Sequence, residues 1–411
     1  MAPSAGGAIS AGGVFSRNDV RSDVSADGLN FALVAEGDAS FTATASALIE
    51  ATLSGEVVAE AAAAEPGASD TTTTDTTSGN DTAAEGSGSG GGSTSVAANG
   101  LIATNMILIE ASASLRDSFA SVGGSLGVEA ENSATITAEN TASTSSSGVA
   151  AGVVLAFNTV GWKSQNIFSA AIDTLIGTDG LGGQQPAVSS AEITNTALEV
   201  GEDLNLTAVT VPQINASIEN SVSSSGGAAV GLVLASNLVS SSANVLLTPK
   251  MDTGADGLSA DNIFTVGGNF LAKSSDTSGI VARIGASVGS EGAAAMGAQL
   301  VRNDVRNTVN TLVDTAVLEV GGDVTLLARG SASITALLSD QGLPELDTGD
   351  SAEPAADEAV AEEPAADAAA GASMALKGLI ATNLVLSDVR VTVFNSDIRA
   401  GGDLTVLARN A

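Results

Sequence analysis

The chain of 411 residues contains no cysteine, no histidine and no tyrosine, and Trp162 is its single tryptophan. Without cysteine, neither disulfides nor thiolate metal sites can hold the fold together. Without histidine, the chain lacks the commonest general base and the commonest transition-metal ligand, so we expect no enzyme and no cofactor. Because aromatic side chains are scarce, we expect a thin core filled by small and β-branched residues.

Positive charge is also scarce, because 14 Lys and Arg residues face 47 Asp and Glu residues and leave a net charge of −33. This excess argues against nucleic acid and anionic membranes as partners, and it predicts weak, diffuse association with cations such as Ca²⁺. The sequence has no apolar run of about 20 residues, so we expect no membrane insertion. We identify no targeting signal in this segment, because its first residues lack the basic and apolar parts of a signal peptide.

Repetition is what the sequence has in abundance. Six copies of one pattern each place an asparagine on the apolar side of an alternating stretch, at Asn18, Asn105, Asn158, Asn237, Asn303 and Asn383. From Asn303 to the turn at Gly321 is 18 residues and from the turn at Gly267 to Asn303 is 36, so the unit without insertions is 54 residues. Such spacing indicates one structural unit stacked many times, which favours a scaffold over an enzyme.

The local pattern within a unit is that of strands. Val301, Asn303 and Val305 share one parity, and the charged Arg302 and Asp304 take the other. Such alternation with β-branched residues is typical of strands that bury one face. The Gly-Gly-Asp turns between strands are interpreted as corners where glycine supplies a positive φ. The sequence therefore predicts an all-β fold, an elongated parallel β-solenoid (β-helix) of about six 54-residue repeats, each with room for two or three coils. Successive antiparallel hairpins are the chief alternative.

Two acidic segments interrupt the repeats, and they hold 7 and 10 acidic residues with no Lys or Arg. Low hydrophobicity with charge of one sign predicts disordered insertions. The resulting organisation is 1–54 repeat 1, 55–98 a Thr/Gly/Ser-rich insertion, 99–147 repeat 2, 148–225 repeat 3 with an insertion, 226–288 repeat 4 with an insertion, 289–338 repeat 5, 339–373 an Ala/Pro-rich insertion and 374–411 repeat 6, truncated. We expect the chain to be a slice of a longer array, with neighbouring repeats of a parent chain as partners, and to self-associate end to end through unpaired strand edges.

Three groups of residues are candidates for a functional site. The six asparagines could form an internal structural ladder or, alternatively, a row of ligand-binding amides. The turn aspartates could bind calcium or cap a turn, and they are Asp38, Asp203, Asp323 and Asp403. Asp252 and Asp256 are weak calcium candidates, because their loop lacks an acidic third position and a Glu at the twelfth. The clearest departure from the repeat holds Trp162, Lys163 and Asp173, and the parity of Trp162 with Asn158 and Val160 predicts a buried aromatic.

The phrases Val-Gly-Gly-Asp-Val-Thr-Leu-Leu-Ala (320–328) and Ala-Gly-Gly-Asp-Leu-Thr-Val-Leu-Ala (400–408) resemble repeats of very large bacterial surface proteins, of the filamentous-haemagglutinin type of β-helical adhesin. The resemblance implies a secreted or surface-attached parallel β-helix that mediates adhesion or forms an extracellular layer. We therefore expect a structural or adhesive segment outside the cell, with surface glycans or other cells as partners. The alternative is a polysaccharide-processing β-helix enzyme or a carbohydrate-binding module, which should show a groove of non-repeating charged residues.

Overall fold

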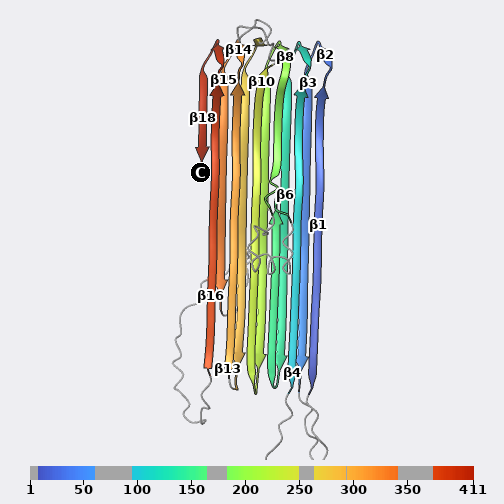
Figure 1. The fold of residues 1–411 in the computed structure, drawn as a ribbon, viewed down its shortest axis with the longest axis vertical. Coiled ribbons are helices and arrows are strands. Elements are labelled where there is room, and N and C mark those ends of the chain that lie inside the picture. The colour runs from blue at the N-terminus through green and yellow to red at the C-terminus, as the bar shows by residue number, and fades with distance from the viewer. Residues whose placement is uncertain (1–7, 61–94, 164–182, 250–262, 293, 341–373) are drawn as a thin grey trace, which may run out of the picture.

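The computed structural model describes residues 8–60, 95–163, 183–249, 263–292, 294–340 and 374–411, and this part of the chain contains strands and no helix. A long strand, a short strand and a second long strand follow one another repeatedly, as Figure 1 shows. The first long strands are β1 (Ile9–Leu29), β4 (Val96–Arg116), β7 (Val149–Val160), β10 (Ala228–Pro249), β13 (Ala294–Asp314) and β16 (Met374–Phe394). The second long strands are β3 (Ala39–Ala59), β6 (Leu126–Ser146), β9 (Leu204–Ser224), β12 (Phe270–Ser290), β15 (Val324–Ser339) and the shorter β18 (Leu404–Asn410).

The short strands lie at the corner between the long ones. They are β2 (Ala32–Ala35), β5 (Phe119–Val122), β11 (Ile263–Val266), β14 (Val317–Val320) and β17 (Asp397–Ala400). In the third succession, β8 (Ala187–Val200) completes the long strand that β7 begins and continues through the corner. We call each succession a coil, so that coil 1 is β1–β3, coil 2 is β4–β6, coil 3 is β7–β9, coil 4 is β10–β12, coil 5 is β13–β15 and coil 6 is β16–β18.

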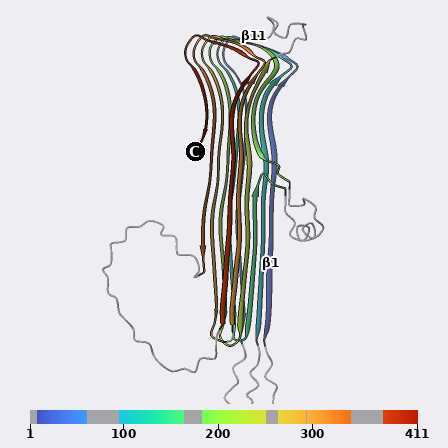
Figure 2. The ribbon, with the colours of Figure 1, turned by 60° about the vertical axis from the view of Figure 1, so that its left-hand side comes forward.

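The coils pair side by side through parallel strands, which form one 12-stranded and one 6-stranded sheet. β10 pairs with β13 so that Asn237 lies opposite Asn303, and β12 pairs with β15 so that Ile280 lies opposite Ile334. The strands run along the long axis of the molecule, and the turned view follows the coils through their shared corner (Figures 1 and 2). The predictions of an all-β fold and of parallel, solenoid-like pairing are confirmed. The hairpin alternative is wrong, because every pair of described strands is parallel.

The core lies between the two sheets and is built from the residues that alternation predicted to face inward. Val305 and Val309 from β13 and Ile280 and Ile284 from β12 are each at most 1% exposed. Alanine, valine, leucine and isoleucine make up most of this continuous cluster, as the shortage of aromatics predicted. In coil 6 the same inward parity is open to solvent, where Val406 of β18 is 51% exposed.

The boundaries of the first predicted insertion are wrong by several residues at each side. β3 continues to Ala59 and β4 begins at Val96, so 55–59 and 96–98 belong to strands. The alternation of β3 carries through Gly55, and Val57 and Ala59 are buried. The acidic and small residues of this stretch resemble those of an insertion, but the alternation of buried and exposed positions continues and marks the end of a strand. Residues 61–94 and 341–373, which hold most of the two predicted insertions, lie outside the described residues.

The backbone at the corners corrects the predicted role of glycine. In the described residues the only glycine with a positive φ is Gly161, so the Gly-Gly-Asp corners do not use that conformation. The left-handed residues stand at the other turn, between the first long strand and the short strand. They are Asn30, Asp117, Asn195, Thr315 and Asn395. Asparagine and aspartate tolerate this conformation because their side chains bond locally to the backbone.

Candidate functional site

The six asparagines lie on one line that crosses the coils, with their side chains inward. Each Nδ2 donates to the Oδ1 of the next coil, over 2.7 Å for Asn18 to Asn105, 2.8 Å for Asn105 to Asn158, 2.8 Å for Asn158 to Asn237, 2.9 Å for Asn237 to Asn303 and 2.8 Å for Asn303 to Asn383. The four middle asparagines are at most 1% exposed. Because each middle amide donates to one neighbour and accepts from the other, this line has the geometry of a structural ladder.

The turn aspartates form a second ladder along the Gly-Gly-Asp corner. Backbone N–H groups donate to the side-chain oxygen of the preceding coil, from Ser125 to Asp38 Oδ1 over 2.8 Å and from Asn269 to Asp203 Oδ1 over 2.7 Å. Asp403 N donates in the same way to Asp323 Oδ1 over 2.8 Å. Each carboxylate therefore caps the next coil and not its own turn. This use of an oxygen for stacking was not among the predicted roles, and calcium binding at these aspartates stays a prediction.

The first glycine of each corner is needed because neighbouring coils approach closely. A Cβ placed on Gly123, Gly201, Gly267, Gly321 or Gly401 would lie closer than 3.0 Å to the carbonyl oxygen of the preceding coil. Real Cβ atoms do not come this close to a backbone oxygen, so only glycine fits. The corner motif therefore encodes close stacking of the backbone. Glycine is required there by a contact between coils, which the sequence pattern alone did not reveal.

Trp162 lies on the outer face of the 12-stranded sheet and not in the core between the sheets. The chain leaves the strand at Gly161, which has a φ of 72°, so the parity that Trp162 shared with Val160 no longer holds. The indole is 6% exposed, and its ring centroid lies 5.0 Å from the guanidinium carbon of Arg306. The predicted burial is present, but on the opposite face. A cation over the ring face is an attractive arrangement worth about 0.5–2 kcal/mol.

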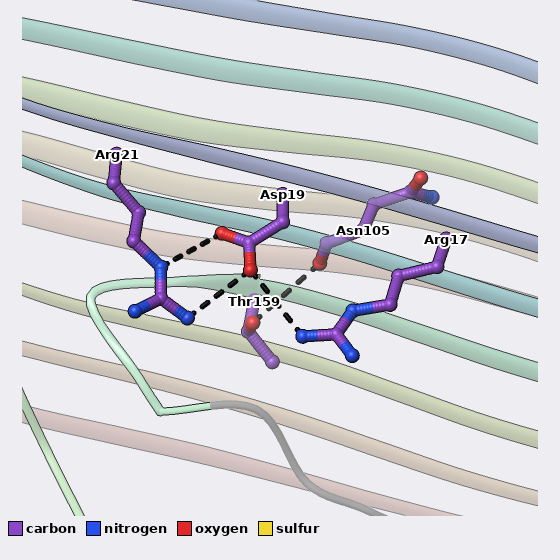
Figure 3. Close-up of polar contacts among 5 residues, drawn as sticks. All are labelled: Arg17, Asp19, Arg21, Asn105 and Thr159. Carbon is purple, nitrogen blue, oxygen red and sulfur yellow. Dashed lines mark hydrogen bonds and ion pairs between the residues drawn. The ribbon is translucent and has the colours of Figure 1, made fainter.

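Asp304, the partner of Arg306, is fully buried between two arginines. Arg302 Nη2 donates to Oδ2 over 3.0 Å, and Arg306 binds both carboxylate oxygens over 2.9 and 2.8 Å. The same arrangement occurs in coil 1, where Arg17 and Arg21 hold Asp19 (Figure 3). The hydrogen bond from Arg21 lowers the pKa of Asp19 below its usual value. Both clusters pair charges internally and leave no carboxylate aimed at an open site.

Asp276 was not among the predicted site residues; it lies in the core on the inward face of β12 and is not exposed. Asn307 Nδ2 and Ser278 Oγ both donate to its Oδ1, with the amide at 3.0 Å, while its Oδ2 has no partner among the described residues. Burial raises the pKa of Asp276 to about 6, against the opposite effect of its hydrogen bonds. A charged residue on a parity otherwise filled by apolar residues and serine was the available signal. The site can hold a proton near neutral pH.

An open groove lies where the second long strands end, and serine hydroxyls line most of it, together with Glu60 and Glu291. The hydroxyls already serve the turns of the backbone. Ser146 Oγ accepts from Gly148 N over 3.0 Å, and Ser224 Oγ accepts from Gly227 N over 3.0 Å. We therefore assign these serines to the turns.

The remaining candidates have no described geometry. Asp173, Asp252 and Asp256 lie outside the described residues, and Lys163 is placed by its backbone N–H, which donates to Gly183 O over 3.1 Å. In the ranges that the structure covers, no three acidic side chains come together as a metal site. Within the same ranges, no helix has the length and apolar character needed to cross a membrane.

Comparison with known proteins finds no matching family model, no similar curated protein and no similar solved structure.

Proposed function

We propose that this chain is a structural segment of a secreted or cell-surface protein, a β-solenoid of about six 54-residue repeats that acts as a stalk or adhesive surface. The observation that carries the proposal is the asparagine ladder. It runs through all six coils, and its amide groups form hydrogen bonds between stacked coils. A scaffold needs the same contact in every coil, whereas an active site needs one coil to differ. Adhesion, secretion and surface location follow from the resemblance to β-helical adhesins.

The charged surface supports an extracellular setting. A net charge of −33 keeps an elongated molecule soluble and spaced from copies of itself. Cations in the medium would screen this charge without a dedicated site. Surface glycans and other cells are the proposed partners, and we propose no contact with nucleic acid.

For the polysaccharide-processing alternative, we consider the serine groove with Glu60 and Glu291, which lies within the described residues. These residues follow the equivalent positions of β3 and β12, three coils apart in register. Three strand spacings put the two backbones about 14 Å apart. Carboxyl pairs in glycosidases lie within about 9.5 Å of each other, so this pair favours no hydrolysis.

Antibodies against the purified chain test the proposed location on cells that produce it. Intact cells should be labelled as strongly as permeabilised cells, and external protease should remove the label. Labelling that requires permeabilisation would contradict the proposal.

Beads coated with the folded chain test adhesion separately. They should bind glycan-bearing cells more than beads coated with an unrelated acidic protein of similar charge. Equal binding by the two kinds of bead would restrict the function to that of a stalk.

A further inference from the structure

The two edges of the stack are complementary in their hydrogen-bonding direction. The asparagine ladder begins with the Oδ1 of Asn18 as its first acceptor and ends with the Nδ2 of Asn383 as its last donor. The corner ladder has the opposite polarity, with the N–H of Asp38 as the donor at its start and the Oδ1 of Asp403 as the acceptor at its end, so its two ends also match. Because all strands are parallel, β16 of one copy could pair with β1 of the next in the register used inside the chain. Head-to-tail growth would follow from these features alone.

One residue of coil 1 opposes this growth. At the first corner position, the other five described coils have glycine, where a Cβ would lie closer than 3.0 Å to the preceding carbonyl oxygen. Coil 1 has Glu36 at this position, since Ala35 lies opposite Val122 and Gly123 is the next residue along. If a second copy placed its Gly401 carbonyl in the usual position, that oxygen would overlap the Cβ of Glu36. Glu36 is exposed and tolerated in coil 1 because, among the described residues, no coil stacks against it on that side.

The interior of coil 1 also departs from the repeat. Gly28 occupies an inward position that Leu115, Ile193, Leu247 and Val313 fill in the register of later coils. The ring of Phe31 takes the space where a side chain on Gly28 would project. Phe31 also packs edge-on against Phe41, with centroids 6.2 Å apart. Two aromatic rings therefore fill the first coil at this corner, in a protein that has 9 Phe residues in total.

We propose that coil 1 is a stop for stacking, in which Glu36 prevents the C-terminal edge of a second copy from docking on β1–β3. The edge formed by β16–β18 keeps the repeat-like corner and is open to a coil that carries glycine there. Of the two edges of the stack, the one formed by β16–β18 can therefore still accept a coil, whereas the one formed by β1–β3 cannot. The stop opposes the end-to-end self-association expected from the sequence, and it does not depend on where in or outside the cell the protein acts.

Three variants separate the Cβ from the charge of Glu36. Glu36→Gly removes both, Glu36→Ala removes the charge and keeps the Cβ, and Glu202→Gly makes the same charge change at a corner inside the stack. Sedimentation velocity in about 1 M NaCl, where the Debye length is about 3 Å, suppresses repulsion between the acidic copies. Glu36→Gly should associate with concentration, with affinity raised about tenfold or more over the wild type. The other two variants should sediment as the wild-type monomer does.

A disulfide readout identifies the register of any association, because the chain has no cysteine of its own. Asp23 and Asp388 lie at equivalent positions of coils 1 and 6, five strand spacings or about 24 Å apart within one chain. Asp23→Cys with Asp388→Cys can therefore cross-link only between copies. With Glu36→Gly added, oxidation should give a ladder of oligomers on a denaturing gel, and without it the chain should stay monomeric.

Three results would overturn the stop. The first is a ladder of oligomers from the chain that carries Asp23→Cys and Asp388→Cys but keeps Glu36. The second is Glu36→Ala that associates as strongly as Glu36→Gly, since the Cβ would then be irrelevant. The third is a monomeric Glu36→Gly chain that stays monomeric when Phe31→Ser, the residue type of coil 2 at this position, is added.

Discussion

The same five residues, Arg-Asn-Asp-Val-Arg, occur at 17–21 in β1 and at 302–306 in β13. In both places the aspartate is held between the two arginines and the asparagine joins the ladder. The surroundings differ, because β1 lies at an edge of the stack while β13 is paired on both sides. The side chain of Asp19 is 26% exposed, whereas that of Asp304 is fully buried, and only the second cluster has an indole over its arginine.

The difference shows that the position of a segment in the stack decides how much its contacts stabilise the fold. An ion pair at the exposed edge is screened by water and contributes little. In the inner cluster the carboxylate of Asp304 is buried, and Trp162 adds a cation–ring contact to Arg306. Substitutions made in matched pairs, one at the edge and one inside, should therefore differ in effect although the residues are the same.

The largest expected difference concerns two aspartates, Asp276 inside and Asp19 at the edge. The pKa of Asp276 is raised from 3.8 to about 6, so the folded state binds its proton more tightly than the unfolded state does. Its contribution to stability is therefore present below about pH 4 and is lost as the pH rises through 6. Relative to wild type, Asp276→Asn should gain up to about 3 kcal/mol of unfolding free energy between about pH 4 and pH 7, from about 1.4 kcal/mol per pKa unit.

Urea unfolding at a series of pH values measures this gain, and Asp19→Asn is the control. The pKa of Asp19 is lowered by Arg21, so its small contribution is present at neutral pH and is lost as the pH falls. The two variants should therefore change the pH profile in opposite directions. A constant offset between wild type and Asp276→Asn would show that Asp276 does not titrate in this window.

The next difference lies within the ladder. Asn303→Leu should lower the unfolding free energy by about 1–3 kcal/mol, because it leaves Asn237 Nδ2 and Asn383 Oδ1 without partners. Asn18→Leu removes the first member and leaves one such atom, the Oδ1 of Asn105, so about half that loss is expected. Thermal melting compares the two variants. Equal losses would mean that enclosure in the stack does not set the value of the ladder.

The smallest difference concerns the arginines. Arg306→Ala should cost about 1 kcal/mol, because it removes the contact with Trp162 and one side of the pair with Asp304. Arg21→Ala should lower the unfolding free energy by less than Arg306→Ala does, because the side chain of Arg21 is 62% exposed. In a Trp162→Phe background the cost of Arg306→Ala should shrink. An unchanged cost there would assign the effect to the ion pair alone.

The sequence predicted the strands and the line of asparagines because both depend on a local period of two. Val305 and Ile280 face the core as their parity required, and Asn237 lies opposite Asn303. The role of the corner glycines could not be predicted in the same way. Gly267 is required by the carbonyl oxygen of Gly201, which is distant in sequence and meets it only through stacking.

Two further features had signals that the repeat pattern obscured. Each of Asn30, Asp117, Thr315 and Asn395 lies 12 residues after a ladder asparagine, as in Asn18 and Asn30, and these residues mark the left-handed turn. Asp276 carries a charge at an inward-facing position. Only one coil has an acidic residue there, so a pattern drawn from what the repeats share did not include it. Trp162 was placed on the wrong face because parity fails once Gly161 turns the chain out of the strand.

Disulfide mapping tests most directly the claim that distant segments stack in one parallel register. Thr308 of β13 lies opposite Asp388 of β16, and both side chains point outward. Thr308→Cys with Asp388→Cys should close an intramolecular disulfide rapidly, since paired strands lie about 4.8 Å apart. Thr308→Cys with Arg390→Cys, shifted by two residues to a separation of about 8 Å, should not close. Equal cross-linking of the two pairs, or closure of the shifted pair alone, would contradict the register.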